Sequence, residues 1–301
     1  MKHILCGITL LSLLLSACSK SAEEEQQLSR AERRRIQVKD SLALKIAVLP
    51  TLDCLPLYIA ADRDFYKKHN VDVRLRPFTA QMDCDTAFTG RSVEGMVSDL
   101  VRAQRLQTQG TAISYGTKTN AYWLLLANQK ARIQKADQLG DKMIAYTKHS
   151  ATHLLTDETL QRAKTKAQVF LIPVNDVSIR LKMLLTGGMD AVWLTEPQAT
   201  VATQNRHVIL ADSRKQHPTL GVIVFNAATT RDARRRQQMD ALWKAYDEAC
   251  DSINQLGYGA YADVLKRHYE LSDKEIAHLP RLTFTHAAAP TQAELTAVRT
   301  H

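Results

Sequence analysis

Two Asp-Cys pairs are the most chemically distinctive residues of this sequence. One is Asp53-Cys54, and the other places Cys84 between Asp83 and Asp85. Thiolates are the ligands that soft metal ions prefer, although the spacing matches no standard zinc finger. Two thiols at neighbouring strand ends could equally form a disulfide in an oxidising compartment. Three states therefore stay open for Cys54 and Cys84: a disulfide, free thiols, or soft-metal ligands.

Histidine and serine also occur together, at His149-Ser150 with His153 nearby. An enzyme would need a nucleophile with a base within reach. The sequence contains neither a Gly-x-Ser-x-Gly elbow nor a His-Glu-x-x-His helix. We therefore predict a protein that is not an enzyme and that holds no cofactor.

The composition is that of an ordinary globular protein. Of the 301 residues, 45% are apolar and 24% are charged, with 11 glycines and 8 prolines. This balance excludes disorder, collagen and coiled coil, and the length suggests two lobes. The net charge of +9 comes from 40 basic and 31 acidic residues, and the basic ones are dispersed. Dispersed charge, together with the export signal described next, argues against a nucleic-acid partner.

The N-terminus has the features of a bacterial export signal. Lys2 precedes an apolar run over 4–15, and small residues lead to Cys18. The run is shorter than the roughly 20 residues of a membrane-spanning helix. Its end, Leu15-Ser16-Ala17-Cys18, resembles the lipobox of bacterial lipoproteins, which implies a signal peptide over 1–17 and a lipid on Cys18. The polar segment that continues to 43 is predicted to be a flexible tether, with a short helix over 31–38 as the alternative.

The rest of the chain alternates between strand and helix patterns, which predicts parallel βαβ units. The predicted strands cover 44–50, 71–75, 93–97, 112–115, 122–127, 143–146, 169–174, 191–194 and 221–225. The main predicted helices cover 55–68, 80–89, 177–185, 259–268 and 272–279. Further helices are predicted to start near 151 and 197, and a long one lies around 239–250. The pattern restarts after residue 127. We therefore assign 44–127 to a first lobe and 128–225 to a second lobe.

Three stretches together resemble the substrate-binding proteins of ABC importers, in the branch for sulfonates, taurine, nitrate and pyrimidine precursors of thiamine. They are Leu57 to Val73, Thr89 to Asp99, and Met183 to Ala199 with its Asp-Ala and Glu-Pro pairs. The resemblance implies an α/β, two-lobed type II periplasmic-binding fold with a ligand cleft between mostly parallel sheets. It also implies that the tail, 226–301, completes the first lobe, which then comprises 44–127 plus 226–301. It also implies a monomer in the cell envelope that faces the periplasm and passes a small solute to an ABC permease in the inner membrane.

Candidate ligand-binding residues follow the predicted strands, because ligands of open α/β sheets bind beyond the carboxyl ends of the strands. The first lobe offers Asp53, Cys54, Asp83, Cys84 and Ser98, and the second offers Asn175 and Glu196. Several of these types are also common helix caps, so capping alone is the alternative for them.

The loops that follow the strands are rich in acidic residues, which predicts a neutral or cationic ligand. Lys148 and His149 are the nearby cations that the pattern places, and Trp193 or Tyr122 could provide a stacking face or belong to the core. Two alternatives to solute transport remain: a soft-metal receptor that uses Cys54 and Cys84, and an enzyme similar to thiamine-pyrimidine synthases.

Overall fold

The protein is described by a computed structural model that covers residues 30–217 and 219–298. The predicted signal peptide and the lipidation site at Cys18 lie outside the described residues. Helix α2 (Arg30–Leu42) occupies the second half of the segment predicted as a flexible tether, so the coil prediction is wrong there and the helical alternative holds. Alanine, leucine, glutamate, glutamine and arginine favour helix, and this segment has no glycine or proline to interrupt it.

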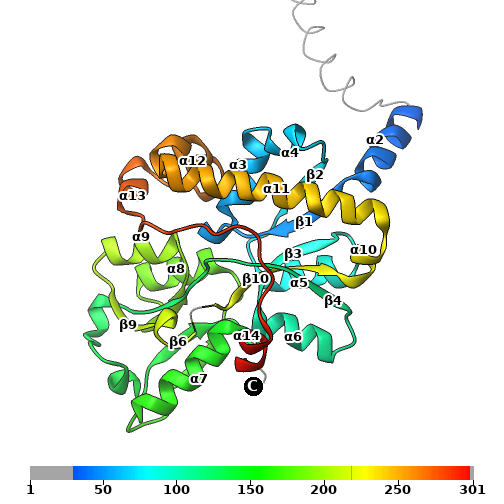
Figure 1. Cartoon of the computed structure of the whole chain (residues 1–301). Helices are drawn as coiled ribbons and strands as arrows, with labels where there is room; N and C mark the ends of the chain where they lie inside the picture. The colour runs from blue at the N-terminus through cyan, green and yellow to red at the C-terminus, as the bar shows by residue number, and fades with distance from the viewer. Residues whose placement is uncertain (1–29, 218, 299–301) are drawn as a thin grey trace, which may run out of the picture. The chain divides into compact units, whose positions relative to one another are not determined.

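The first lobe is built on a five-stranded sheet with the order β2-β1-β3-β10-β4 (Figure 1). Its strands are β1 (Leu44–Val48), β2 (Val73–Pro77), β3 (Gly95–Asp99), β4 (Ile113–Lys118) and β10 (Gly221–Asn226). Strand β1 pairs in parallel with β2 and β3, whereas β10 runs antiparallel to both of its neighbours. The flanking helices are α3 (Leu55–Asp62), α4 (Phe65–Lys68), α5 (Gln81–Thr89), α6 (Leu100–Thr108), α10 (Ala227–Arg231) and α11 (Ala233–Leu256).

The second lobe repeats this arrangement with the order β7-β6-β8-β5-β9. Its strands are β5 (Leu124–Ala127), β6 (Met143–Tyr146), β7 (Phe170–Pro173), β8 (Ala191–Leu194) and β9 (Val208–Asp212), and its helices are α7 (Ala151–Ala163), α8 (Val177–Thr186) and α9 (Gln198–Gln204). Strand β5 is the antiparallel member here. The sequence pattern did not predict β9, which lies at the edge of the sheet and is only partly buried. The prediction of two mostly parallel sheets flanked by helices is confirmed.

Two strands lie in the opposite sheet from the one predicted. The sequence pattern assigns 122–127 to the first sheet and 221–225 to the second, but β5 pairs with β8 and β9 while β10 pairs with β3 and β4. The physical reason is packing between residues that are far apart in the sequence. The Phe225 ring of β10 lies against Gly95 of β3, where a Cβ atom would come within 2.7 Å of the ring. Gly95 therefore leaves the space that lets β10 insert into the first sheet.

The C-terminal part returns to the first lobe. Helices α12 (Ala262–Tyr269) and α13 (Asp273–His278) follow α11, and an extended segment then runs to α14 (Gln292–Ala297), which lies near α6 in Figure 1. The Lys118 N–H donates to the Ala288 carbonyl at 2.8 Å, and the Gln104 side chain donates to the Leu295 carbonyl at 2.5 Å. These bonds attach the end of the described chain to β4 and α6.

Candidate functional site

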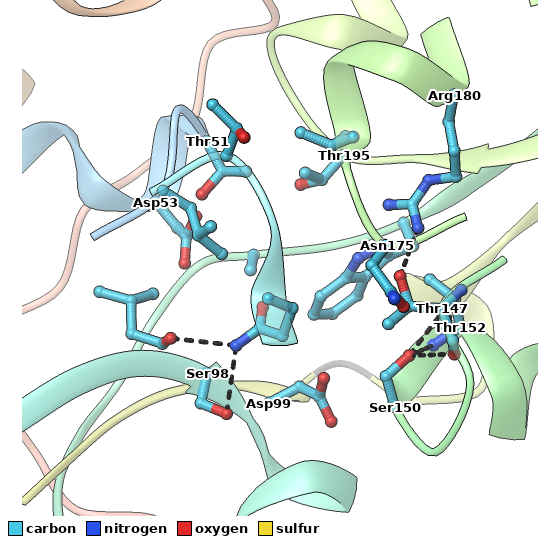
Figure 2. A pocket seen from close by; sticks show the side chains of 17 residues that line it. Thr51, Asp53, Ser98, Asp99, Thr147, Ser150, Thr152, Asn175, Arg180 and Thr195 are labelled. Atoms are coloured by element: carbon cyan, nitrogen blue, oxygen red, sulfur yellow. Dashed lines mark hydrogen bonds between the residues drawn. The ribbon is translucent and has the colours of Figure 1, made fainter. Parts of the chain in front are cut away.

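A polar pocket lies where the carboxyl ends of strands from the two sheets meet (Figure 2). Its volume is about 50 Å³, which is room for a few waters when one water needs roughly 10–15 Å³. The first lobe and its connection to β5 contribute Leu49, Thr51, Asp53, Thr79, Gln81, Val97, Ser98, Asp99, Ala121 and Trp123, and the second contributes Thr147, Ser150, Thr152, Asn175, Val177, Arg180 and Thr195. The pocket is therefore small, and hydroxyl and amide groups dominate its polar lining.

Three of the predicted ligand-binding residues line this pocket. Asp53 lies in the short 3-10 turn over Leu52–Cys54 after β1, Ser98 lies near the end of β3, and Asn175 follows β7. Asp53 and Asn175 come from the segments after a strand and Ser98 from the end of one, where the helix N-termini of an α/β fold also point.

The other four predicted residues lie outside the pocket lining. Cys54 and Cys84 are buried in the core of the first lobe, and Asp83 is exposed on α5. Glu196 is buried, but its Oε1 accepts from the Tyr122 hydroxyl at 2.7 Å, and its Oε2 accepts from the Thr200 amide at 3.0 Å. The alternative that Glu196 caps a helix fits this geometry, since α9 begins just after it.

The carboxylate of Asp99 joins the first turns of two helices. Its Oδ1 accepts from the Arg102 amide of α6 at 2.9 Å and from the Ala151 amide of α7 at 3.0 Å. Burial raises the pKa of Asp99 to about 6, against the opposing effect of the Arg102 guanidinium and the two amides. One carboxylate of the first lobe therefore satisfies the N-terminus of a helix in the second lobe.

Asp53 is the second buried carboxylate of the pocket. Its Oδ2 accepts from the Thr119 hydroxyl at 2.9 Å. Burial raises the pKa of Asp53, and the hydroxyls of Thr51 and Thr119 oppose that rise. Hydroxyls are thus the groups that stabilise this carboxylate.

The opposite wall is formed by the start of α7 and by Arg180 of α8. The Ser150 hydroxyl donates to the Thr147 carbonyl at 2.7 Å and accepts from the Thr152 amide at 3.1 Å, so it caps α7. Arg180 donates through Nη1 to the Thr147 hydroxyl and to the Val174 carbonyl, while its Nε is buried without a hydrogen-bond partner. Burial lowers the pKa of Arg180 to about 10.

Sequence reasoning missed Arg180 and Trp123 and considered other cations, whereas its core alternative for Trp193 agrees with the structure. Lys148 is exposed and outside the pocket, so Arg180 provides its positive charge. Trp193 belongs to the core, and the aromatic side chain that lines the pocket is Trp123. A signal for Arg180 was present: it lies on the same face of the helix as buried Val177 and Leu184, three residues after one and four before the other.

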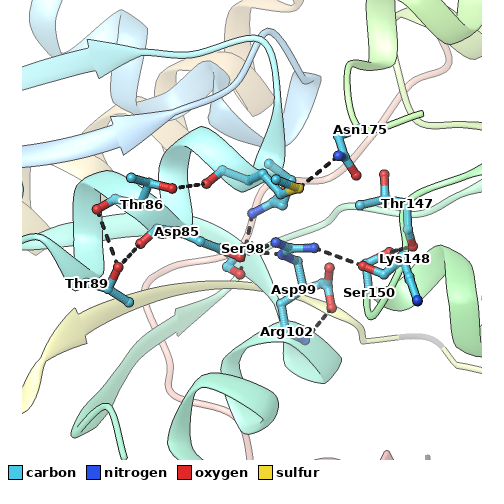
Figure 3. Close-up of polar contacts among 12 residues, drawn as sticks. Asp85, Thr86, Thr89, Ser98, Asp99, Arg102, Thr147, Lys148, Ser150 and Asn175 are labelled. Carbon is cyan, nitrogen blue, oxygen red and sulfur yellow. Dashed lines mark hydrogen bonds and ion pairs between the residues drawn. The ribbon is translucent and has the colours of Figure 1, made fainter. Parts of the chain in front are cut away.

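Hydrogen bonds beside the pocket join the two lobes in this structure (Figure 3). The Arg102 guanidinium, which is paired with Asp85 of its own lobe, donates to the Lys148 carbonyl of the second lobe at 3.2 Å. Farther along the junction, the Leu52 amide donates to the Glu196 carbonyl at 2.7 Å, and the Gln198 side chain donates to the Pro50 carbonyl at 2.8 Å. With the Asp99 bond to α7, these contacts define a closed arrangement of the cleft.

The cysteines of the described chain form no disulfide in this structure. Cys54, Cys84 and Cys250 are all buried and unbridged, so of the three states that the sequence left open for Cys54 and Cys84 the structure has free thiols. Burial raises the pKa of the Cys84 thiol to about 12. Among the residues that the structure covers, no group of three or more His, Cys, Asp or Glu side chains is placed to hold a metal ion.

The histidine and serine residues considered for catalysis are engaged in other contacts. The Ser150 hydroxyl bonds to Thr147 and Thr152, as described above, and not to an imidazole. The His153 Nδ1 accepts from the His149 amide at 3.2 Å, and its Nε2 lies 3.7 Å from an Asp157 oxygen. The geometry therefore pairs neither histidine with Ser150 as a general base.

Comparison with known proteins identifies the family. A family model described as NMT1-like matches residues 38–263. The chain belongs to the NMT1-like family. A search of curated proteins returned no sequence match for this NMT1-like chain. The resemblance to importer-associated binding proteins is confirmed at the level of the family and of its structural neighbours.

Solved structures show the fold of this NMT1-like protein. A protein from Bordetella bronchiseptica RB50 superimposes with a TM-score of 0.71 at 19% identity, over 86% of this chain and 89% of that one. The periplasmic aliphatic sulphonate binding protein SsuA from Escherichia coli gives 0.68 at 18% identity, over 85% and 88%. The ligand-binding component of an ABC-type import system from Staphylococcus aureus, with zinc bound, gives 0.67 at 14% identity, over 86% and 90%. At these identities the likeness shows a shared periplasmic-binding fold.

None of the helices within residues 30–217 and 219–298 combines the length and the apolar character needed to cross a bilayer.

Proposed function

We propose that this protein is the solute-binding component of an ABC importer and that it captures a small polar molecule by closing its two lobes. The observation that carries the proposal is the pocket itself, which collects buried polar groups from the strand ends of both sheets. A ligand there would be enclosed by the same movement that brings the lobes together. The solute would then pass to a permease in the inner membrane, and the binding protein would act as a monomer.

The function is tested by a melting screen of the purified protein over sulfonates, amines, amino acids, pyrimidines and metal salts. We expect at least one compound to raise the melting temperature and to reduce the radius of gyration measured by X-ray scattering. Asn175→Trp, which fills the pocket, should abolish both effects. Ser178→Trp, on the exposed face of the same segment, should retain them. A single radius in every condition and no stabilising compound would contradict the proposal.

We also propose that a lipid on Cys18 anchors the protein in the cell envelope, on the strength of its lipobox-like sequence. The wild-type protein expressed in a bacterial host should partition into the detergent phase of a Triton X-114 extraction. Cys18→Ala should move to the aqueous phase, and Cys250→Ala should behave as wild type. Partitioning that does not change in Cys18→Ala would rule out the anchor.

A further inference from the structure

The charges of the pocket are few and lie on opposite walls. Of its lining residues only Asp53, Asp99 and Arg180 are ionisable, and each is 5% exposed or less. The two carboxylates belong to the first lobe and the guanidinium to the second. Figure 2 shows Asp53 and Arg180 on opposite sides of the pocket. Because all three ionisable side chains are buried, little solvent reaches them to screen their charges.

Asp99 is already stabilised within the protein. It accepts backbone N–H groups from the first turns of α6 and α7, and it thereby occupies the position at the α7 N-terminus where an anion would bind. Two ionisable groups, Asp53 and Arg180, remain for a ligand.

Neither of these two groups forms an ion pair among the described residues, although the Asp176 carboxylate, which caps α8, favours the charged form of Arg180 from outside contact distance. The neighbours of Asp53 are hydroxyls, and the Arg180 guanidinium donates to a hydroxyl and a carbonyl while its Nε has no partner. A buried charge without a counter-charge is unfavourable. A ligand that supplies both counter-charges removes both penalties when it binds.

Other ligand charges leave one of the two groups without a partner. An anion would pair with Arg180 but would be repelled by Asp53, and a cation would have the reverse effect. A neutral molecule would leave both charges uncompensated.

We propose that the ligand is a compact zwitterion, with its cationic group against Asp53 and its anionic group against Arg180. This inference rests on the proposed function, because it assumes that the pocket is a solute site. A guanidinium binds carboxylates and sulfonates by the same charge-assisted hydrogen bonds, so both anions fit the proposal. The small pocket favours a ligand with a short chain between its two charges.

Isothermal titration calorimetry with matched compounds tests the proposal. The zwitterions are β-alanine and 2-aminoethanesulfonate, and their singly charged counterparts are propionate, ethanesulfonate and propylamine. Stabilising compounds from the broad screen join the series, each with a version that lacks one charge. We expect a zwitterion to bind the wild-type protein at least 10-fold more tightly than its singly charged counterparts. The two anion types show which oxyanion the site prefers.

Two variants should change the preference in opposite directions. Asp53→Asn should weaken the zwitterion at least 10-fold while the matched anion binds as well as before or better. Arg180→Met should weaken the zwitterion while the matched cation keeps its affinity or gains. A variant that only damaged the fold would weaken every compound alike.

The outcomes separate this inference from the function on which it rests. A neutral or singly charged compound that binds as tightly as any zwitterion would overturn the inference and leave the solute-binding function intact. Equal weakening of all compounds in both variants would also overturn it. If no compound of any charge binds or compacts the protein, the proposed function fails as well.

Discussion

The two walls of the pocket are unlike in charge although they are built from similar sheets. The first lobe presents the carboxylates of Asp53 and Asp99, and the second presents the Arg180 guanidinium among the hydroxyls of Thr147 and Ser150. Closure compensates Asp99 directly, because the α7 N-terminus meets it. Asp53 and Arg180 are left for whatever enters between them. One contact, made by Asp99, therefore serves lobe closure, and two groups stay available for recognition.

We expect the largest effect at Asp99, whose carboxylate joins the two lobes. The effect is a dependence of the free energy of unfolding on pH. Burial raises the pKa of Asp99 from 3.8 to about 6. Between these values the folded state keeps a proton that the unfolded state has lost, so the free energy of unfolding falls as the pH rises from about 4 to about 6. At about 1.4 kcal/mol per pKa unit, the loss is up to about 3 kcal/mol.

Urea unfolding of wild type and Asp99→Asn at a series of pH values measures this contribution. The variant should lack that part of the fall, while Asp83→Asn, at an exposed position on α5, should follow the wild type. An equal fall in Asp99→Asn would contradict the assignment of the shift to Asp99.

The recognition side of the comparison is tested by Arg180→Met. A hydrogen bond to a charged group contributes about 1.5–3 kcal/mol, so affinity for the best-bound compound should fall by about 10- to 100-fold. Lys182→Met, at an exposed position of the same helix, should bind like the wild type. Calorimetric titration of both variants, checked for folding by circular dichroism, provides the measurement. Unchanged affinity in Arg180→Met would mean that the second wall does not bind the ligand by its charge.

Removing a neutral polar side chain from either wall should weaken ligand binding less than Arg180→Met does, and by a similar factor on the two walls. Ser98→Ala in the first lobe and Asn175→Ala in the second should each weaken binding about 2- to 10-fold, since a neutral hydrogen bond contributes about 0.5–1.5 kcal/mol. Asp83→Ala is the matched control outside the pocket. If neither variant differs from this control, the two side chains have only a structural role.

The lobes also differ in their cysteine content, which predicts a pattern of chemical modification and no change in ligand affinity. All three cysteines of the described chain belong to elements of the first lobe, and all are buried. Iodoacetamide should leave Cys54, Cys84 and Cys250 unmodified in the native protein and should alkylate them after denaturation without reductant. Peptide mapping by mass spectrometry provides the measurement. Alkylation of Cys54 and Cys84 only after reduction would establish the disulfide that the sequence suggested.

Much of the fold was predictable because short apolar runs alternate with helical spacing. The strands β6 and β8 have the predicted bounds, and α8 differs by one residue. The exchange of β5 and β10 was not predictable from periodicity, because the same apolar run fits either sheet. What decides it is long-range packing, such as Phe225 against Gly95.

The pocket was predictable in its location but not in its charge. Loops after strands placed Asp53, Ser98 and Asn175 correctly at the lining, because strand ends converge in this kind of sheet. Arg180 was missed because it lies inside a helix, beyond the loops that were considered. Cys54 and Asp83 lie next to these loops, but their side chains do not line the pocket. The position of a residue at a strand end or helix start does not show the direction of its side chain.

The position of β10 has a consequence for the order in which the protein can form. β10 lies between β3 and β4, so β4 has no strand partner until residues 221–226 have been synthesised. By then all the strands of the second sheet have already been synthesised. A nascent chain that stops before residue 221 carries a first sheet in two pieces, β2-β1-β3 and a lone β4. The first lobe begins earliest on the ribosome and yet is completed last.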